Sequence, residues 1–399
     1  MDDLPTIARR MTGIAPFHVM EVQTAARAME ARGIDVVHME IGEPDFPTPV
    51  PVCDAARRAL DGGDIYYTSA LGLPELRHAI AAHYASHYGV DVDPARVIVT
   101  SGSSAALLLV LALIVDRDAG ILMADPNYPC NRHLVRTLEG TPVSIAVDAT
   151  TRYQLTAALV ERAWTRATRG VLVASPSNPT GTTIAADELA RIAASVARRG
   201  GHLIVDEIYL GLTYGGAPRS ALAVLDDAFV ISSFSKHFNM TGWRLGWIVA
   251  PLRHVRDLEK LAQNLYISPP TLSQRAALAC FEPATLAIVE ARREAFQQRR
   301  DYLVRELRRL GFGIPLLPDG GFFIYADCSR WSSDSEAFCR DALANAGVAF
   351  TPGIDFGTHR ANVHVRFAYT VALAKLETGV ARLGAWLTTL DRTRTTAHA

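Results

Sequence analysis

A lysine and an arginine stand eight positions apart in the segment SFSKHFNMTGWRLGW (233–247). The chain has only three lysines, Lys236, Lys260 and Lys375, so a lysine at this place is not a routine surface choice. Lysine differs from arginine because its amine can lose its proton and then act as a nucleophile or a base. Lys236 and Arg244 therefore predict a site that combines a reactive amine with a permanent cation.

Lys236 comes shortly after the apolar run AFVISS (228–233), and polar residues also follow other apolar runs of the chain. Small residues that open a helix present free N–H groups, which suit a phosphate, although a serine N-cap explains the same pattern. No histidine or cysteine stands at ligand spacing from Asp206 and Glu207, so we expect no metal site. The residues after the runs are Ser101-Gly102-Ser103-Ser104, Asn178 within SPSNPTG, Asp206-Glu207 with Tyr209, and Lys236.

Seven short apolar runs alternate with helix-like stretches such as 185–199. Continuously apolar runs indicate strands that are buried on both faces of a sheet. The alternation predicts an α/β fold with a mostly parallel, doubly wound, seven-stranded sheet, whose strand ends gather the polar residues above. The runs are RVIVT (96–100), GILMA (120–124), TPVSIAV (141–147), GVLVAS (170–175), GHLIVDE (201–207), AFVISS (228–233) and GWIVA (246–250).

The rest of the chain predicts a smaller α+β domain built from both termini. A helical stretch (271–307) is long enough to connect two domains. It is followed by two apolar runs (318–329 and 362–370) with a helix between them (334–346). We expect an N-terminal segment of the small domain over 1–48, a large domain over 49–285 and the remainder of the small domain over 286–399.

Composition excludes several partners. A formal net charge of −1 over 399 residues provides no field for nucleic acid or an anionic membrane. The longest apolar run (105–115) is about half of a membrane span, so we expect a buried helix there. The acidic start MDDLPTIARR does not resemble a signal peptide, and five scattered cysteines without C-x-x-C indicate reduced thiols. These features favour a cytoplasmic location.

One cofactor requires this set of strand-end residues. Pyridoxal 5'-phosphate needs a lysine for its aldehyde, a carboxylate to keep its ring nitrogen protonated, donors to its ring oxygen and an anion site for its phosphate. A buried acidic partner is needed because the ring would otherwise lose its proton near neutral pH. We therefore expect this cofactor at the sheet edge.

The motifs SPSNPTG, VDEIYLGLTYGG and SFSKHFNMTGWRLGW resemble the class I/II pyridoxal-phosphate aminotransferases of fold type I, the aspartate aminotransferase superfamily. Further stretches follow the family's order over essentially the whole chain. They are GIDVVHMEIGEPDFPTP (33–49), YYTSALGLPELRHAIA (66–81), VTSGSSAALL (99–108), DPNYP (125–129) and VHVRFAYT (363–370).

The resemblance implies a role for each matching residue. Lys236 would form the Schiff base with the cofactor and shuttle the substrate proton, and Asp206 would pair with the ring nitrogen. Asn178 and Tyr209 would bind the ring oxygen, and Tyr128 would stack on the ring. The phosphate would be held by Gly102, Ser103, Ser104, Ser233 and Arg244, with Ser235 a further candidate. The substrate would be bound by Arg366, which clamps its carboxylate, together with Asn178 and the backbone near Gly42.

The resemblance also implies a homodimer with shared active sites, because Tyr67 matches a tyrosine that reaches the neighbouring subunit's phosphate. The adjacent Tyr66 is the alternative. A cis bond at Asn178–Pro179 is expected as well. Two positions depart from the family pattern: Asn131 replaces a second aromatic, and the phosphate loop reads Gly-Ser-Ser. Both departures concern fine specificity rather than the cofactor.

Three functions are open to such a sequence. The first is an aminotransferase that moves an amino group from an L-amino acid to a 2-oxo acid, most often 2-oxoglutarate, in a ping-pong cycle through Lys236. The second is a C–S β-lyase or related lyase or synthase on the same scaffold. The third is a non-catalytic ligand sensor. The presence of the full set of catalytic residues argues against this function. The N-terminal region resembles a subgroup that often handles several amino acids, so the donor stays open.

Overall fold

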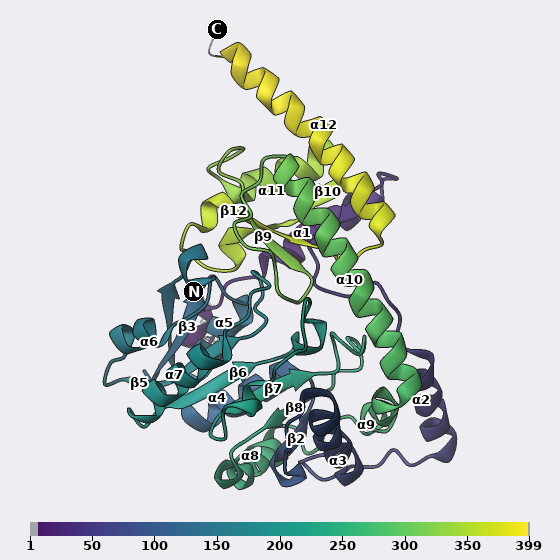
Figure 1. The fold of residues 1–399 in the computed structure, drawn as a ribbon, viewed down its shortest axis with the longest axis vertical. Helices are drawn as coiled ribbons and strands as arrows, with labels where there is room; N and C mark the ends of the chain where they lie inside the picture. Colours follow the sequence, from purple (N-terminus) through teal and green to yellow (C-terminus); the bar gives the residue numbers. More distant parts are fainter. Residues whose placement is uncertain (1–6, 398–399) are drawn as a thin grey trace, which may run out of the picture.

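The computed structural model describes the backbone of residues 7–397 and the side chains of residues 7–391. A seven-stranded sheet forms the centre of the larger, lower part of the molecule, with helices on both of its faces (Figure 1). Its strand order is β2-β8-β7-β6-β5-β3-β4. The strands are β2 (Val97–Thr100), β3 (Gly120–Asp125), β4 (Thr141–Ala146), β5 (Thr168–Ala174), β6 (His202–Asp206), β7 (Phe229–Ser233) and β8 (Gly246–Val249).

The predicted fold class and all seven predicted strands are confirmed. Only β8 runs antiparallel to its neighbours β2 and β7, and the remaining pairs are parallel. Side chains alternate between two cores: Val97 and Val99 pack into one, and Ile98 packs into the other. The expectation of burial on both faces is wrong for β4, because this edge strand has a neighbour only in β3 and exposes Thr141 and Ser144.

Helices cover the two faces of this sheet. The apolar run 105–115 lies in α4, which packs with α8 on one face, as predicted for a buried helix. Over residues 7–397 no helix has the length and apolar character to cross a membrane. The helices are α2 (Val50–Gly62), α3 (Pro74–His83), α4 (Ser103–Ile114), α5 (Pro129–Thr137), α6 (Ala157–Ala163), α7 (Ala186–Ala197), α8 (Leu252–Leu265) and α9 (Thr271–Ala277).

A second unit lies above the sheet in Figure 1 and contains segments from both ends of the chain. Its antiparallel sheet has the order β11-β12-β9, and β1 pairs in parallel with β10. The domain boundaries at 48 and 285 stay a prediction. The elements are α1 (His18–Glu30), β1 (Val37–His38), α10 (Pro283–Arg309), β9 (Phe323–Asp327), α11 (Ser335–Ala346), β10 (Val348–Ala349), β11 (Thr351–Pro352), β12 (His364–Ala368) and α12 (Leu373–Ala397).

The helical stretch 271–307 is divided in the structure. Pro283 occupies the first turn of α10, and proline restrains the residue before it from helical geometry, so Glu282 is extended. The 27-residue helix α10 then runs from α2 to α12 alongside both units (Figure 1). Short helical turns complete the chain: η1 (Arg9–Gly13), η2 (Tyr84–Tyr88), η3 (Pro94–Arg96), η4 (Ala149–Thr151), η5 (Leu210–Leu212), η6 (Ala221–Ala223), η7 (Leu278–Phe281), η8 (Gly353–Asp355) and η9 (Ala361–Val363).

Candidate active site

A cavity of about 240 Å³ lies where the carboxyl ends of the parallel strands face the smaller unit. Most of the predicted site residues line it, although they are far apart in the sequence. Parallel strands bring their carboxyl ends to one edge, which explains this convergence. The predicted residues in its lining are Gly42, Ser103, Ser104, Tyr128, Asn178, Asp206, Tyr209, Ser235, Lys236, Arg244 and Arg366.

Lys236 follows β7 and places its amine inside the cavity. Its Nζ donates a 2.7 Å hydrogen bond to the carbonyl oxygen of Gly42. Burial lowers the pKa of Lys236 to about 8; the positive charges of Arg366 and Arg244 act in the same direction, and Glu43 opposes them. About a tenth of the amine is therefore neutral at pH 7, and the neutral form is the one that acts as a nucleophile.

Asp206 ends β6 with a buried carboxylate. Burial raises its pKa to about 6, while the backbone N–H of Ile208 at 3.1 Å and the charge of Lys236 pull it down. Among the side chains of residues 7–391, Lys236 is the cation that acts on this carboxylate, and it does so without a recorded ion pair. A buried carboxylate of this kind would be stabilised by a cationic group placed in the cavity.

The N-terminus of α4 and Arg244 form a cationic end of the cavity. Gly102 precedes the helix with a φ of 86°, and a Cβ there would lie 2.6 Å from Arg244 Nη2. Arg244 donates through Nη1 to the carbonyl oxygen of Thr241 at 2.9 Å and to Ser235 Oγ at 3.5 Å. Free N–H groups at a helix start and a guanidinium group together suit a phosphate.

The two serines near Lys236 have different positions. Ser235 lines the cavity, whereas Ser233 is not part of its lining. Ser233 Oγ donates to the carbonyl oxygen of Leu245 and accepts from the backbone N–H of Ser235. Ser233 thus supports the loop that carries Ser235, and Ser235 is the better-placed ligand for an anion.

Arg366 on β12 forms the opposite, buried end of the cavity. Its Nη1 donates to Asn178 Oδ1 at 3.0 Å, and its Nη2 donates to the carbonyl oxygen of Glu40 and to Thr351 Oγ1. Its Nε is buried without a partner, and burial lowers its pKa to about 10. A buried guanidinium with an unused donor is suited to a carboxylate.

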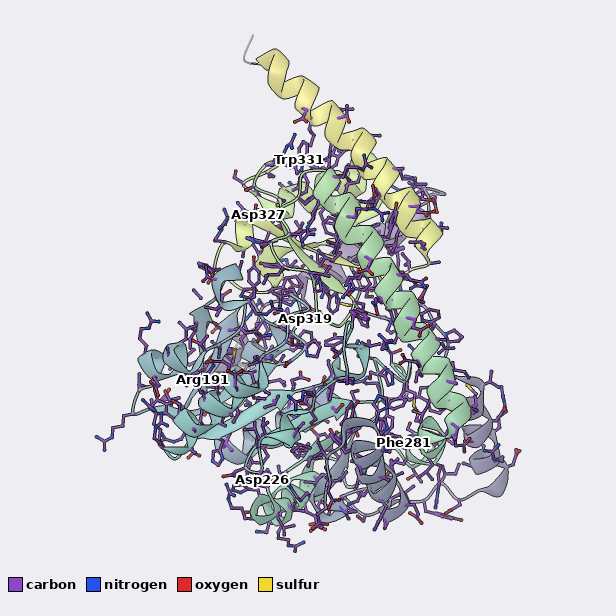
Figure 2. All side chains as sticks on the ribbon, viewed as in Figure 1. Arg191, Asp226, Phe281, Asp319, Asp327 and Trp331 are labelled. Atoms are coloured by element: carbon purple, nitrogen blue, oxygen red, sulfur yellow. The ribbon has the colours of Figure 1, made fainter. Side chains whose placement is uncertain are left out.

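The loop after β5 presents Asn178 between these ends. Its Oδ1 accepts from Arg366, so its NH₂ group is left for a ligand. Asp319 from the smaller unit, labelled between the two units in Figure 2, accepts from the backbone N–H and Oγ1 of Thr183 and from Arg152. The predicted cis bond at Asn178–Pro179 is present. The hydrogen bond from Arg366 fixes the orientation of the Asn178 amide.

Two aromatic residues complete the predicted set. Tyr209 and Tyr128 line the cavity, and burial raises the pKa of both phenols, so each remains a hydrogen-bond donor at neutral pH. Asn131, the first departure from the family pattern, is buried in α5 and is not part of the lining. Ser103 and Ser104, the second departure, do line the cavity.

Tyr67 lies outside the cavity of its own chain. Its exposed fraction is 80%, and that of Tyr66 is 79%. Both stand with the exposed Ile65 on the segment between α2 and α3. Such exposed aromatic residues are typical of a surface that another protein covers.

Sequence reasoning missed an apolar wall of the cavity. Phe17, Val19 and Met20 from the start of α1, and Phe323 from β9, line it. Phe17 packs edge-on against Tyr128, and the Arg366 guanidinium lies 4.2 Å from the centre of the Phe323 ring. These side chains carry no chemical group that marks a site.

The residues present fit pyridoxal 5'-phosphate. Its phosphate matches the end formed by α4 and Arg244, its aldehyde matches the buried amine of Lys236, and its ring nitrogen matches the buried carboxylate of Asp206. Among residues 7–391, no group of three or more His, Cys, Asp or Glu side chains is arranged to hold a metal ion.

Comparison with known proteins identifies the family. Residues 34–383 match the family "Aminotransferase class I and II". The chain is 41% identical to the valine–pyruvate aminotransferase of Mycobacterium tuberculosis over 94% of this chain and 97% of that protein. It is 31% identical to an aspartate aminotransferase of Geobacillus stearothermophilus over 94% of this chain and 98% of that protein.

Solved structures agree with the sequence matches. A crystal structure of an aminotransferase from Mycobacterium tuberculosis superimposes with a TM-score of 0.93 at 41% identity, covering 97% of this chain and all of that one. The fold is therefore that of fold type I aminotransferases. The relatives are named aminotransferases, so the lyase alternative is not favoured. The chain belongs to the class I and II aminotransferases and is a transaminase.

Proposed function

We propose that this transaminase uses pyridoxal 5'-phosphate to move an amino group from an L-amino acid with an apolar side chain to a 2-oxo acid. The observation that carries the proposal is the position of the Lys236 amine, buried between the cationic end at Arg244 and the carboxylate-binding end at Arg366. When bound, the cofactor supplies an aldehyde for amines and a protonated ring that withdraws electrons from the substrate.

The chain's own residues would hold the cofactor at three points. Lys236 would bind its aldehyde carbon, and Asp206 would keep its ring nitrogen protonated, since a buried carboxylate favours a cationic neighbour. Asn178 and Tyr209 would donate to its ring oxygen. The phosphate would be bound by Arg244, Ser235 and the start of α4 with Gly102, Ser103 and Ser104, while Ser233 supports this loop.

Arg366 would bind the substrate's α-carboxylate and so orient its α-carbon toward Lys236. Once its amine is free, Lys236 Nζ would take the proton from that carbon and return it at a different atom, which is general base and general acid work. The pKa of about 8 suits both tasks near neutral pH. The carbonyl oxygen of Gly42 holds Nζ in position between these events.

The lining of the cavity supports an apolar substrate side chain. Its cations among the described residues are Lys236, Arg244 and Arg366, and each has a task in the proposal above. The wall of Phe17, Val19, Met20 and Phe323 offers apolar surface, which favours aliphatic side chains. The similarity to a valine–pyruvate aminotransferase also supports a substrate with an apolar side chain.

The acceptor uses the same site in a ping-pong cycle. A cavity without a spare cation favours a monocarboxylic acceptor such as pyruvate over 2-oxoglutarate. A panel of donors with both acceptors tests this: L-valine with pyruvate should give a higher kcat/KM than L-aspartate with 2-oxoglutarate. The opposite order would show that a side-chain carboxylate is recognised.

We further propose a cytoplasmic homodimer in which Tyr67 completes the partner's phosphate site. The exposure of Tyr66 and Tyr67 supports a covered surface, and five free cysteines suit a reducing compartment.

Spectroscopy of the holoenzyme tests the reaction itself. Mixing it with L-valine and no oxo acid should convert the absorbance band of the cofactor's aldehyde form into that of its amine form, with one equivalent of oxo acid released. An unchanged band with no oxo acid released would contradict transamination of L-valine.

A further inference from the structure

Glu40 places a fully buried carboxylate next to the segment that holds Arg366. Its exposed fraction is 0%, and its backbone carbonyl accepts from Arg366 Nη2 and from Thr351 Oγ1. Its Oε2 has no hydrogen-bond partner, whereas Oε1 lies 2.7 Å from His38 Nδ1. A buried carboxylate with one partner depends strongly on that partner.

The His38 ring lies between two carboxylates. Val37 and Met39 pack into the core of the smaller unit, so the strand alternation directs His38 and Glu40 to the other face. There His38 Nε2 lies 3.1 Å from Glu30 Oε1, at the last residue of α1. Both ring nitrogens face carboxylate oxygens, which favours the doubly protonated, positively charged imidazole.

The segment that carries this pair also reaches the reacting groups. Backbone hydrogen bonds tie Met39 to Ala349 and to Ala368, and Ile41 accepts from Thr370 Oγ1. The segment ends at Gly42, whose carbonyl oxygen accepts from Lys236. A change at His38 or Glu40 therefore acts on the surroundings of both Arg366 and Lys236 through one short stretch of backbone.

We propose that His38 is a positioning residue that, as a cation, holds Glu40 in place and cancels its charge beside Arg366, so that Arg366 stays available to the substrate carboxylate. This proposal rests on the proposed role of Arg366. The charge of Glu40 acts on Arg366, so without the charge of His38 this buried anion would compete electrostatically with the substrate carboxylate.

The surroundings define when His38 carries this charge. Glu40 on its own segment and Glu30 on α1 raise the pKa of His38 to about 9, with burial acting against them. The helix α12 also packs against β1, but its Lys375 and Arg382 are both paired with Asp35. His38 is therefore charged at pH 7–8 and loses its charge as the pH rises through about 9.

Inhibition of the holoenzyme by 3-methylbutanoate tests the proposal, because this acid offers a carboxylate and no amine. We expect the wild-type Ki to stay constant from pH 7 to 8 and to rise about tenfold as the pH passes 9. His38→Asn retains a donor to Glu40 but no charge, so its Ki should be raised about five- to tenfold at pH 7 with no further step near pH 9. Glu40→Gln removes the charge that needs cancelling, and its Ki should stay low across the range.

Two further variants separate the possible failures. Glu30→Gln changes the half-exposed outer carboxylate and should leave Ki at pH 7 within about twofold. Arg366→Lys should raise Ki at every pH; an unchanged value would overturn the proposed function of Arg366. If Arg366→Lys raises Ki but His38→Asn matches the wild type at every pH, the role of His38 is refuted. Should His38→Asn fail to fold, equal pH profiles for Glu40→Gln and the wild type would refute it.

Discussion

The side-chain amine of Lys236 donates a 2.7 Å hydrogen bond to the carbonyl oxygen of Gly42, 194 positions earlier in the chain. Lys236 follows the last parallel strand of the large sheet, whereas Gly42 follows β1 of the smaller unit. The contact therefore joins the two units at the reacting group. It also holds the amine toward the cavity rather than toward bulk water.

Replacement of Lys236 by alanine should abolish transamination, because no other described amine lines the cavity. The matched control is Lys260→Ala, which removes an exposed lysine paired with Asp257 on α8. Steady-state turnover with L-valine and pyruvate measures both variants. Residual activity of Lys236→Ala above about one thousandth of the wild type would contradict the nucleophilic role.

Loading of the apoprotein with pyridoxal 5'-phosphate should speed up as the pH rises through about 8. The pKa of Lys236 is lowered by burial, and only the neutral amine attacks an aldehyde, so the rate should level off above about pH 9. Stopped-flow absorbance follows the reaction. A rate that continues to climb toward pH 10.5, the range of an ordinary lysine, would show that the amine is not desolvated.

Asp206→Asn should stabilise the apoprotein and impair the enzyme. Burial raises the pKa of Asp206 from 3.8 to about 6, so the folded state loses stability as the pH rises through this window, and the loss is complete at pH 7. Two pKa units correspond to about 3 kcal/mol, and we expect a gain of about 2–3 kcal/mol in urea unfolding at pH 7.

The gain from Asp206→Asn should vanish below about pH 4, where the carboxyl group is protonated in both states. Activity should fall at least about 100-fold, as for the loss of one electrostatic contact to a reacting group. A variant that is destabilised at pH 7 would contradict the conclusion that burial of the charged carboxylate destabilises the apoprotein.

Gly102→Ala should weaken cofactor binding about tenfold or more. The new Cβ would lie 2.6 Å from Arg244 Nη2, and the φ of 86° disfavours any residue with a side chain. Gly62→Ala on α2 is the control, because a Cβ there meets nothing within 4 Å. Equilibrium titration of the two apoproteins provides the affinities. Equal affinities would exclude a phosphate site at the start of α4.

Tyr67→Phe should raise the dissociation constant of the cofactor, while Tyr66→Phe should leave it unchanged. Both side chains are exposed in the single chain, so an effect of one hydroxyl alone requires a partner subunit. Fluorescence titration measures the affinity, and sedimentation velocity checks that both variants are dimers. The reverse ranking of the two tyrosines would assign the contact to Tyr66.

Much of the fold followed from local sequence patterns. Apolar runs with polar residues at their ends predicted the seven strands, and the ends predicted the convergence of Asn178, Asp206 and Lys236. The exposed face of β4 was missed because a continuous apolar run does not reveal that its strand stands at the edge of a sheet. The break at Pro283 was missed within a longer helical pattern, although proline was its signal.

The site was predicted best where a residue type has a specific chemistry. Lysine, aspartate and arginine narrow the possible roles, whereas Phe17 and Met20 could fill any core, and only the tertiary structure places them in the cavity. Likewise, residue type does not distinguish Ser233 from Ser235 as a phosphate ligand. The structure does, because Ser233 donates to Leu245 while Ser235 lines the cavity. The pairing of His38 with Glu40 could not be predicted from the sequence, because it depends on Val37 and Met39 facing the core of the smaller unit.

The pairing of β1 with β10 has a consequence for the synthesis of the protein. Val37 leaves the ribosome early, but its partner Val348 is made 311 residues later. The backbone of residues 37–42, which includes the acceptor of Lys236 at Gly42, therefore lacks these neighbours until residues 348–349 have emerged. A nascent chain can form much of the central sheet beforehand, yet the complete catalytic cavity arises only after Val348 has been made.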